Sequence, residues 1–198
     1  MISLQKKIIL ASSSPRRRDI LRQMGIAFDI VESSVEEKLV SHKEPAELVS
    51  DLAYLKAKDV AEGLAADCLV IGADTIVYKD RILGKAKNRQ QAFEMLDYLQ
   101  GGWHQVITGL ALIDRSINYS KTLFEISRVK MMPLLREQIE EYLDTGEYIG
   151  KAGSYAIQAR AAAFISKIDG CYFNIVGLPA SSLYKELNHY KQLLATGC

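Results

Sequence analysis

The sequence has few cysteines and no long apolar run, and both shortages narrow the class of protein. Its three cysteines, Cys68, Cys171 and Cys198, are an odd set without the paired spacing of a zinc site or a disulfide framework. No stretch approaches the roughly 20 apolar residues that a membrane span needs, and residues 1–7 are too polar for a signal peptide. We therefore expect a soluble, cytoplasmic protein that folds around its own apolar core.

The sequence also lacks an excess of charge of either sign. Lysine and arginine number 25 against 24 acidic residues, and a net charge of +1 provides no general field to attract nucleic acid. There is no Walker phosphate loop, no dinucleotide-binding glycine fingerprint and no nucleophile elbow. We expect a small-molecule ligand, with no nucleic acid and no membrane as partner, and an anionic ligand would have to be held by local geometry.

Hydrophobic periodicity predicts alternating strands and helices. Apolar or β-branched runs predict strands at residues 7–11, 27–31, 68–73, 106–113 and 121–129, with a hairpin around 79–81. Apolar residues at helical spacing, with proline, glycine or a capping residue at the ends, predict helices at 16–24, 45–64, 88–99, 133–143 and 181–194. Segment 161–168 is expected to be sheet or a short buried segment, and segment 174–179 a turn. The mixture predicts an α/β (mixed α+β) fold, with a central twisted mixed sheet flanked by helices.

Residues 12–18 read Ser-Ser-Ser-Pro-Arg-Arg-Arg and lie between a predicted strand and a predicted helix. Free backbone N–H groups and the helix dipole favour an anion there, serine hydroxyls donate further hydrogen bonds, and arginine can bind phosphate through two parallel bonds. The alternative is structural: Ser14 caps the helix, Pro15 occupies its first turn, and the arginines form a solvated face. The residues alone leave both interpretations open, because three adjacent arginines point in different directions around a helix.

Acidic residues near predicted strand ends are candidate metal ligands. Asp74 follows the apolar strand 68–73, where a carboxylate can bind a divalent cation or orient and deprotonate water. An ordinary turn or cap aspartate is the alternative. Glu37, with Glu32 and Glu36, follows the strand at 27–31 and offers oxygen ligands for Mg²⁺ or Mn²⁺, although exposed loop acids are the commoner case.

Three further residues are candidates for contact with a nucleotide. Lys56 and Lys85 are possible point charges for phosphate oxygens, and the alternative for each is a surface lysine. Gln158 follows a segment that contains two glycines, and its amide could read a base edge because it both donates and accepts. The alternative there is a glycine-rich turn followed by a strand.

Six short motifs occur in order along nearly the whole chain. They are Leu-Ala-Ser-Ser-Ser-Pro-Arg-Arg at 10–17, Gly-Ala-Asp-Thr-Ile-Val at 72–77, Leu-Gly-Lys at 83–85, His-Gln-Val-Ile-Thr-Gly at 104–109, Lys-Ala-Gly-Ser-Tyr-Ala-Ile-Gln at 151–158 and Asn-Ile-Val-Gly-Leu-Pro at 174–179. Together they resemble the Maf family of nucleotide pyrophosphatases. The resemblance implies one Maf-like domain over residues 1–198, two lobes with a cleft between them, a divalent metal (Mg²⁺ or Mn²⁺) and a homodimer.

The resemblance also implies a role for each matching residue. Asp74 and Lys85 become the expected catalytic residues, and Asp74 and Glu37 the expected metal ligands. Contacts to the triphosphate are expected from Ser12, Ser14, Arg16, Arg17 and Lys56.

Base specificity is expected from Arg16, Thr75 and Gln158, where a sister subfamily acting on methylated GTP typically has tryptophan, glutamine and glutamate. The three residues resemble the dTTP and UTP type, since a glutamine can both donate to and accept from the O4/N3–H edge of thymine or uracil. Two departures lie near the expected base pocket: the family usually has an acidic residue at the position of Gly150 and a glycine at that of Ala159.

The expected activity is hydrolysis of dTTP and UTP, or of modified pyrimidine nucleotides, to the monophosphate and pyrophosphate. Water would attack the α-phosphorus in line, and stabilising the charge of the departing pyrophosphate would be the main catalytic task. Two alternatives stay open: a pyrophosphatase for purine or other modified nucleotides, and a nucleotide-binding regulator of septum formation.

Overall fold

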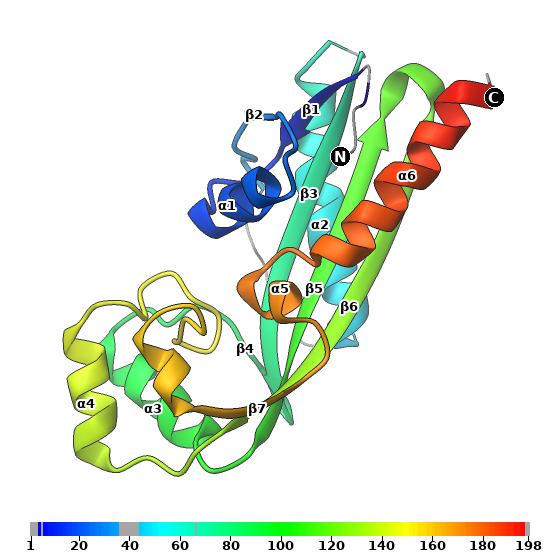
Figure 1. Ribbon diagram of the computed structural model, residues 1–198. Helices are drawn as coiled ribbons and strands as arrows, with labels where there is room; N and C mark the ends of the chain where they lie inside the picture. Colours follow the sequence, from blue (N-terminus) through cyan, green and yellow to red (C-terminus); the bar gives the residue numbers. More distant parts are fainter. Residues whose placement is uncertain (1–3, 5, 36–43, 66, 197–198) are drawn as a thin grey trace. The chain divides into compact units, whose positions relative to one another are not determined.

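The computed structural model describes residues 4, 6–35, 44–65 and 67–196. In this part of the chain seven strands form one mixed sheet in the order β2-β1-β3-β5-β6-β7, with β4 paired to β3 (Figure 1). The strands are β1 (Lys7–Leu10), β2 (Asp29–Ile30), β3 (Cys68–Lys79), β4 (Arg81–Leu83), β5 (Trp103–Asp114), β6 (Tyr119–Met131) and β7 (Ile165–Asp169). The β1 strand is parallel to β2 and β3, whereas the β3/β4 and β6/β7 pairs are antiparallel.

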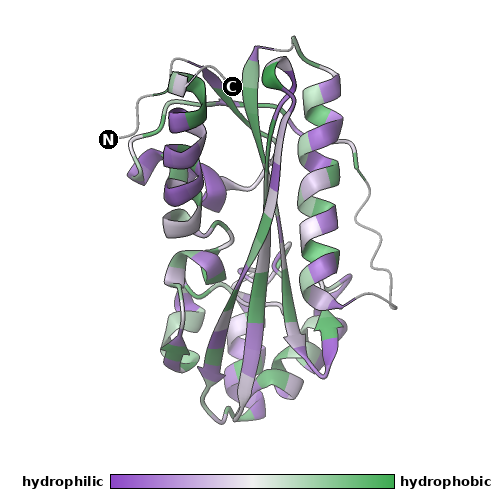
Figure 2. Cartoon of the chain, turned by 90° about the vertical axis from the view of Figure 1, so that its right-hand side faces the viewer, coloured by the Kyte–Doolittle hydropathy of each residue, from purple (hydrophilic) through white to green (hydrophobic). Residues whose placement is uncertain are grey.

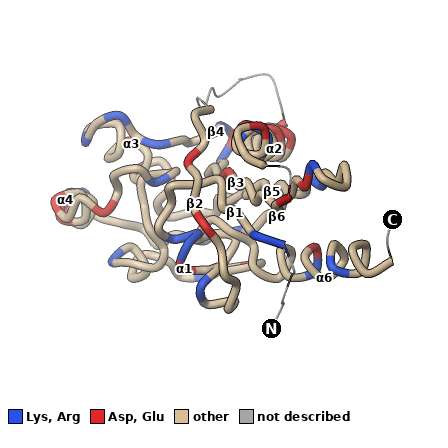
Figure 3. The backbone as a smooth tube through the Cα atoms, turned by 90° about the horizontal axis from the view of Figure 1, so that it is seen from above, with Lys and Arg blue, Asp and Glu red and all other residues tan. Residues whose placement is uncertain are grey.

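Helices and two short 3₁₀ segments connect the strands. They are α1 (Pro15–Gln23), α2 (Pro45–Glu62), α3 (Arg89–Leu99), α4 (Arg136–Asp144), α5 (Tyr172–Val176), α6 (Ala180–Thr196), η1 (Arg115–Ile117) and η2 (Arg160–Phe164). No helix among the described residues is both long and apolar enough to cross a membrane. Basic and acidic residues are interspersed along the chain (Figure 3), in keeping with the net charge of +1.

The chain divides into two compact units, and β3, β5 and β6 contribute residues to both. Unit 1 comprises Met1–Asp74, Thr108–Glu125 and Gly177–Cys198, and unit 2 comprises Thr75–Ile107 and Ile126–Val176. The mixed sheet flanked by helices confirms the predicted fold class. The single domain over 1–198 and the cleft between lobes stay predictions.

In unit 1, α2 and α6 cover opposite faces of the sheet (Figure 2). Gly109 of β5 faces the backbone of α2 at Val49, whereas Asp114, on the other face of the same strand, accepts a hydrogen bond from Tyr190 of α6. Hydrophilic and hydrophobic residues lie side by side along α2, as expected for a helix with one buried face (Figure 2).

The close packing of α2 depends on two glycines of the sheet. A Cβ atom on Gly72 would lie 2.3 Å from the carbonyl oxygen of Ala53, and one on Gly109 would lie 2.1 Å from that of Val49. Real Cβ atoms do not approach backbone this closely. The absence of a side chain at these two positions therefore sets the depth at which α2 lies on β3 and β5.

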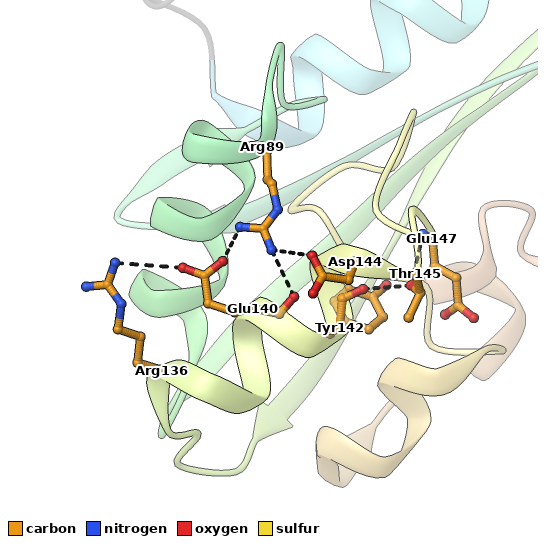
Figure 4. A network of polar contacts seen from close by, with 7 residues as sticks. All are labelled: Arg89, Arg136, Glu140, Tyr142, Asp144, Thr145 and Glu147. Carbon is orange, nitrogen blue, oxygen red and sulfur yellow. Dashed lines mark hydrogen bonds and ion pairs between the residues drawn. The ribbon is translucent and has the colours of Figure 1, made fainter.

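In unit 2, ion pairs join the start of α3 to the end of α4 (Figure 4). Arg89 contacts Glu140 and lies 2.6 Å from Asp144, and Arg136 lies 3.7 Å from Glu140. The α3 helix begins at a normal cap, because Asn88 accepts a hydrogen bond from the backbone N–H of Gln91 at 2.9 Å. The ion pairs are solvent-exposed, so we expect each to add at most about 1 kcal/mol of stability.

Local patterns predicted most of these elements, and three of the differences can be traced to specific contacts. The strand expected at 68–73 continues to Lys79, because its second half pairs with β4 across the predicted hairpin. The helix expected from residue 133 begins at Arg136, where Gln138 accepts a hydrogen bond from the Leu135 N–H. A short helix, α5, overlaps the segment 174–179 that was expected to be a turn, and its buried Asn174 donates a hydrogen bond to the Val106 carbonyl of β5.

Candidate active site

Asp74 lies in the middle of β3, not at the strand end where it was predicted. The neighbouring strand β1 stops at Leu10, opposite Ile71, whereas β3 runs on and pairs with β4 from Val77. Asp74 therefore lies just beyond the end of its parallel neighbour while its own backbone stays within a strand. The residue is 5% exposed, so its carboxylate is held by the sheet and not by a loop.

Lys56 of α2 forms an ion pair with Asp74. Lys56 Nζ lies 2.6 Å from Asp74 Oδ1, and the two side chains are 10% and 8% exposed. This burial rules out the surface-lysine alternative for Lys56 and the turn-aspartate alternative for Asp74. Each charge compensates the other in a region where an unpaired charge would be costly, and the depth of α2 at Gly72 brings the amine to the carboxylate.

The serine-arginine segment at the start of α1 is ordered by Arg17. Ser12 Oγ accepts hydrogen bonds from Arg17 Nη1 at 2.9 Å and from the Ser14 N–H at 3.3 Å. Arg17 Nε donates to the carbonyl oxygen of Gly177 at 2.8 Å, and Arg17 is only 9% exposed. Ser14 occupies the N-cap position but makes no side-chain capping bond. Pro15 occupies the first turn of α1, as the structural alternative expected, but the capping bond from Ser14 and the solvated position of Arg17 that it also expected are wrong.

Two motifs come together in unit 2. Lys85 and Ala152 form an antiparallel bridge, and the Gly153 N–H donates to the Gly84 carbonyl at 3.1 Å. Gly153 has φ +66°, and a Cβ atom there would lie 2.8 Å from a methyl carbon of Val77. The absence of a side chain at Gly153 therefore allows motif 151–158 to pack against Val77 of β3 while it pairs with motif 83–85.

The two departures from the family pattern fit the backbone. Ala159 has φ −125°, an extended conformation that needs no glycine. Gly150 has φ +70°, in the left-handed region that glycine adopts at little cost, and nothing lies within 4 Å of a Cβ built there. Neither position strains the segment that carries Gln158.

A buried pair in unit 2, His104 and Tyr155, had no role in the sequence interpretation, although both residues lie within motifs. His104 Nε2 lies 2.7 Å from Tyr155 Oη, and the rings meet edge to face with centroids 5.4 Å apart. Burial, together with the nearby positive charge of Lys79, lowers the pKa of His104 to about 4. Burial likewise raises the pKa of Tyr155. Both side chains are therefore neutral at pH 7.

The lowered pKa of His104 predicts a loss of stability in mild acid. Between the unfolded pKa of about 6.5 and the folded value, the unfolded chain binds a proton that the folded chain excludes, so stability falls as the pH drops through this window. We expect the His104 contribution to the free energy of unfolding to be about 2 kcal/mol lower at pH 5 than at pH 7. Urea unfolding at pH 5 and at pH 7 measures this difference in unfolding free energy.

The matched variants are His104→Gln and His189→Gln, since His189 is exposed on α6. The difference in unfolding free energy between pH 7 and pH 5 should shrink in the first and persist in the second. An unchanged difference in His104→Gln would show that His104 is not the group responsible.

Asn174 links two further motifs. Its Nδ2 donates to the Val106 carbonyl at 3.0 Å and to Ser127 Oγ at 2.9 Å, and Ser127 Oγ in turn donates to the Cys171 carbonyl at 3.0 Å. Motifs 104–109 and 174–179 are thus joined by a buried amide. With the Arg17–Gly177 bond and the pairing at Lys85, the motifs that are scattered in the sequence are tied together by hydrogen bonds within each unit.

Comparison with known proteins identifies the family. Residues 7–190 match the family model described as Maf-like protein. The chain belongs to this family. Three relatives of this Maf-like chain are each named dTTP/UTP pyrophosphatase: one from Acetivibrio thermocellus is 49% identical over 89% of this chain and 92% of its own length. Those from Alkaliphilus metalliredigens and Alkaliphilus oremlandii are 46% and 47% identical over 93% of this chain and 96% and 97% of their own lengths.

The predicted site residues of this Maf-like chain fall in both units. Unit 1 holds Ser12, Ser14, Arg16, Arg17, Lys56 and Asp74, and unit 2 holds Thr75, Lys85 and Gln158. Arg16 and Thr75 are half-buried, whereas Lys85 and Gln158 are exposed. Glu37 lies outside the described residues. The binding of one nucleotide by both sets stays a prediction.

The donor set suits a metal that arrives with a triphosphate. No group of three or more histidine, cysteine, aspartate or glutamate residues gathers within the described part of the chain. Mg²⁺ commonly takes one or two carboxylates and completes its shell with substrate phosphates and water. A single buried carboxylate such as Asp74 meets that requirement in part, and a resident cage of protein ligands is not needed.

Proposed function

We propose that this chain is a nucleoside triphosphate pyrophosphatase that hydrolyses dTTP and UTP to the monophosphate and pyrophosphate. The observation that carries the proposal is the buried Asp74–Lys56 pair, with Nζ 2.6 Å from Oδ1, within the range 7–190 that matches this family. Relatives 46–49% identical over most of the chain are named for this activity. The carboxylate is fixed by β3 and has its charge balanced from one side, which suits a group that must hold one orientation during repeated turnover.

In the proposed mechanism each residue either transfers a proton or stabilises negative charge. Asp74 accepts a proton from the attacking water or orients that water toward the α-phosphorus. Lys85, Ser12 and Arg16 stabilise the negative charge that builds on the departing pyrophosphate. Arg17 holds Ser12 through a 2.9 Å hydrogen bond, so its contribution to triphosphate binding includes fixing that hydroxyl.

A divalent metal completes this proposal. Mg²⁺ or Mn²⁺, when bound, would polarise the phosphoryl oxygens, and Asp74 and Glu37 together with substrate phosphates would hold it. Lys56 neutralises part of the Asp74 charge and fixes the carboxylate in place. A homodimer and a cytoplasmic location are further parts of the proposal, and static light scattering tests the first.

Pyrimidine preference is assigned to Gln158, Thr75 and Arg16. A glutamine amide both donates and accepts, which matches the O4/N3–H edge of thymine or uracil. Gln158 is exposed at the end of a buried segment, so its amide is available to a ligand.

A panel of nucleotides tests the proposal directly. Purified protein with Mn²⁺ should release pyrophosphate from dTTP and UTP with kcat/KM at least about 10-fold above the values for ATP, GTP and 7-methyl-GTP, because a site built to hydrogen-bond one base edge rejects others. Chelation of the metal should abolish release. A preference for purines would contradict the assigned specificity, and tight dTTP binding without product would favour a regulator over an enzyme.

A further inference from the structure

The segment that ends at Gln158 is held from several sides within unit 2. Residues 153–157 are buried and Gln158, the next residue, is exposed. Ser154 adopts φ +61°, an uncommon conformation for a residue other than glycine, and its hydroxyl lies 3.2 Å from Met95 Sδ. Such a backbone persists only where its surroundings fix it. The segment therefore presents one polar side chain from a rigid support.

Three hydrogen bonds fix the turn around Gln158. His104 Nε2 and Tyr155 Oη lie 2.7 Å apart, three residues before the glutamine. Tyr142 Oη accepts the N–H of Ala156 at 3.2 Å, and the Ala159 N–H donates to the Ala156 carbonyl at 3.0 Å. The turn that carries Gln158 is thus closed on itself and attached to β5 and α4.

His104 and Tyr155 are placed to act on this turn and not on a ligand. They are 3% and 5% exposed. His104 lies near the start of β5, where the sheet holds its backbone. The contact between the two rings leaves Tyr155 little freedom to rotate. Only Ala156 and Ile157 separate Tyr155 from Gln158, so a displacement of Tyr155 would also move the Gln158 amide.

We propose that His104 and Tyr155 are positioning residues for base recognition: their hydrogen bond fixes the backbone turn that presents Gln158 to the pyrimidine. This inference rests on the proposed function and adds to it two residues that never touch the nucleotide. A purely structural hydrogen bond would affect stability alone, whereas a positioning bond also affects the KM for a substrate whose base Gln158 reads.

The test is a double-mutant cycle between Tyr155→Phe and Gln158→Ala, assayed with dTTP. Tyr155→Phe removes one oxygen and keeps the ring, so we expect KM to rise about 5- to 10-fold with kcat within about 2-fold of wild type. In the Gln158→Ala background, Tyr155→Phe should leave KM unchanged, because the side chain it positions is gone. His104→Phe/Tyr155→Phe leaves no unpaired polar group at the pair and should match the KM of Tyr155→Phe, which keeps the test available if the single variant folds poorly.

The matched control is Tyr119→Phe in unit 1. The Tyr119 hydroxyl also donates a hydrogen bond, to Glu186 Oε1 at 2.6 Å, so this variant loses a comparable bond and should keep the wild-type KM. Equal rises in KM with and without Gln158 would overturn the positioning role while the pyrophosphatase proposal stands. Absence of pyrophosphate release from dTTP by the wild-type protein would overturn both.

Discussion

Asp74→Asn should lower kcat by about 10²- to 10⁴-fold, the range that general acid-base groups contribute. The substitution keeps the shape of the side chain and removes the charge that would accept a proton or bind a metal. It also leaves Lys56 buried beside a neutral amide, and removing one partner of a buried pair destabilises a protein by about 3–5 kcal/mol. We therefore expect a less stable protein as well as a slower one, and pyrophosphate release must be measured well below its melting temperature.

Asp114→Asn separates these two effects. Asp114 is also buried and paired with a lysine, since Lys6 Nζ lies 3.1 Å from its Oδ2, and it accepts a 2.8 Å hydrogen bond from the Ser116 N–H. Hydrogen bonding from Tyr190 and Ser116 and the nearby Lys6 lower its pKa in spite of burial. This variant should lose stability but, while folded, turn over dTTP at close to the wild-type rate. Wild-type turnover in folded Asp74→Asn would remove Asp74 from the mechanism.

Gly109→Ala should destabilise the protein by about 3 kcal/mol, a large effect for one added methyl group. The new Cβ would lie 2.1 Å from the carbonyl oxygen of Val49 and 2.8 Å from the Ser50 nitrogen, both in the backbone of α2. A helix backbone cannot yield as a flexible side chain does, so α2 must move away from the sheet. Urea unfolding monitored by circular dichroism measures the loss.

Gly63→Ala is the matched control for that substitution. Gly63 caps the end of the same helix with φ −81°, and the nearest atom to a built Cβ is 3.7 Å away. The methyl group fits there and reduces the freedom of the unfolded chain, so stability should stay the same or rise by up to about 1 kcal/mol. If Gly109→Ala were as stable as Gly63→Ala, the close approach of α2 would not be a constraint on this fold.

Local patterns in the sequence predicted the elements of this fold, and partners decided where they end. The α2 helix was predicted within about two residues, because Leu48, Val49 and Leu52 repeat at helical spacing and bury one face. The hairpin around 79–81 was predicted, but one continuous strand through residues 74–79 was not, and residues 77–79 of this stretch pair with β4. Pairing is a property of two segments, and a single segment carries little signal of it.

The site was predicted as a list of residues, and the structure adds their environment. Arg16, Arg17 and Arg18 are indistinguishable as sequence, whereas in the structure Arg17 is buried and donates hydrogen bonds to Ser12 and to the Gly177 carbonyl. The burial of Lys56 depends on the glycines of a distant strand, which no pattern on α2 records. Residue types therefore indicated the chemistry, whereas contacts distant in sequence decide which side chains support it.

Each unit of this protein is built from stretches that are not contiguous in the chain, and this limits how the protein can be truncated or recombined. Unit 1 is built from three separate stretches of chain and unit 2 from two, because β3, β5 and β6 belong to both. No contiguous piece of the gene therefore encodes either unit. Neither can be expressed by simple truncation, shuffled into another protein by one recombination event, or lost by a terminal deletion without breaking the strands of the other. The serine-arginine segment of unit 1 and the segment of Gln158 in unit 2 must therefore be expressed and folded as parts of one chain.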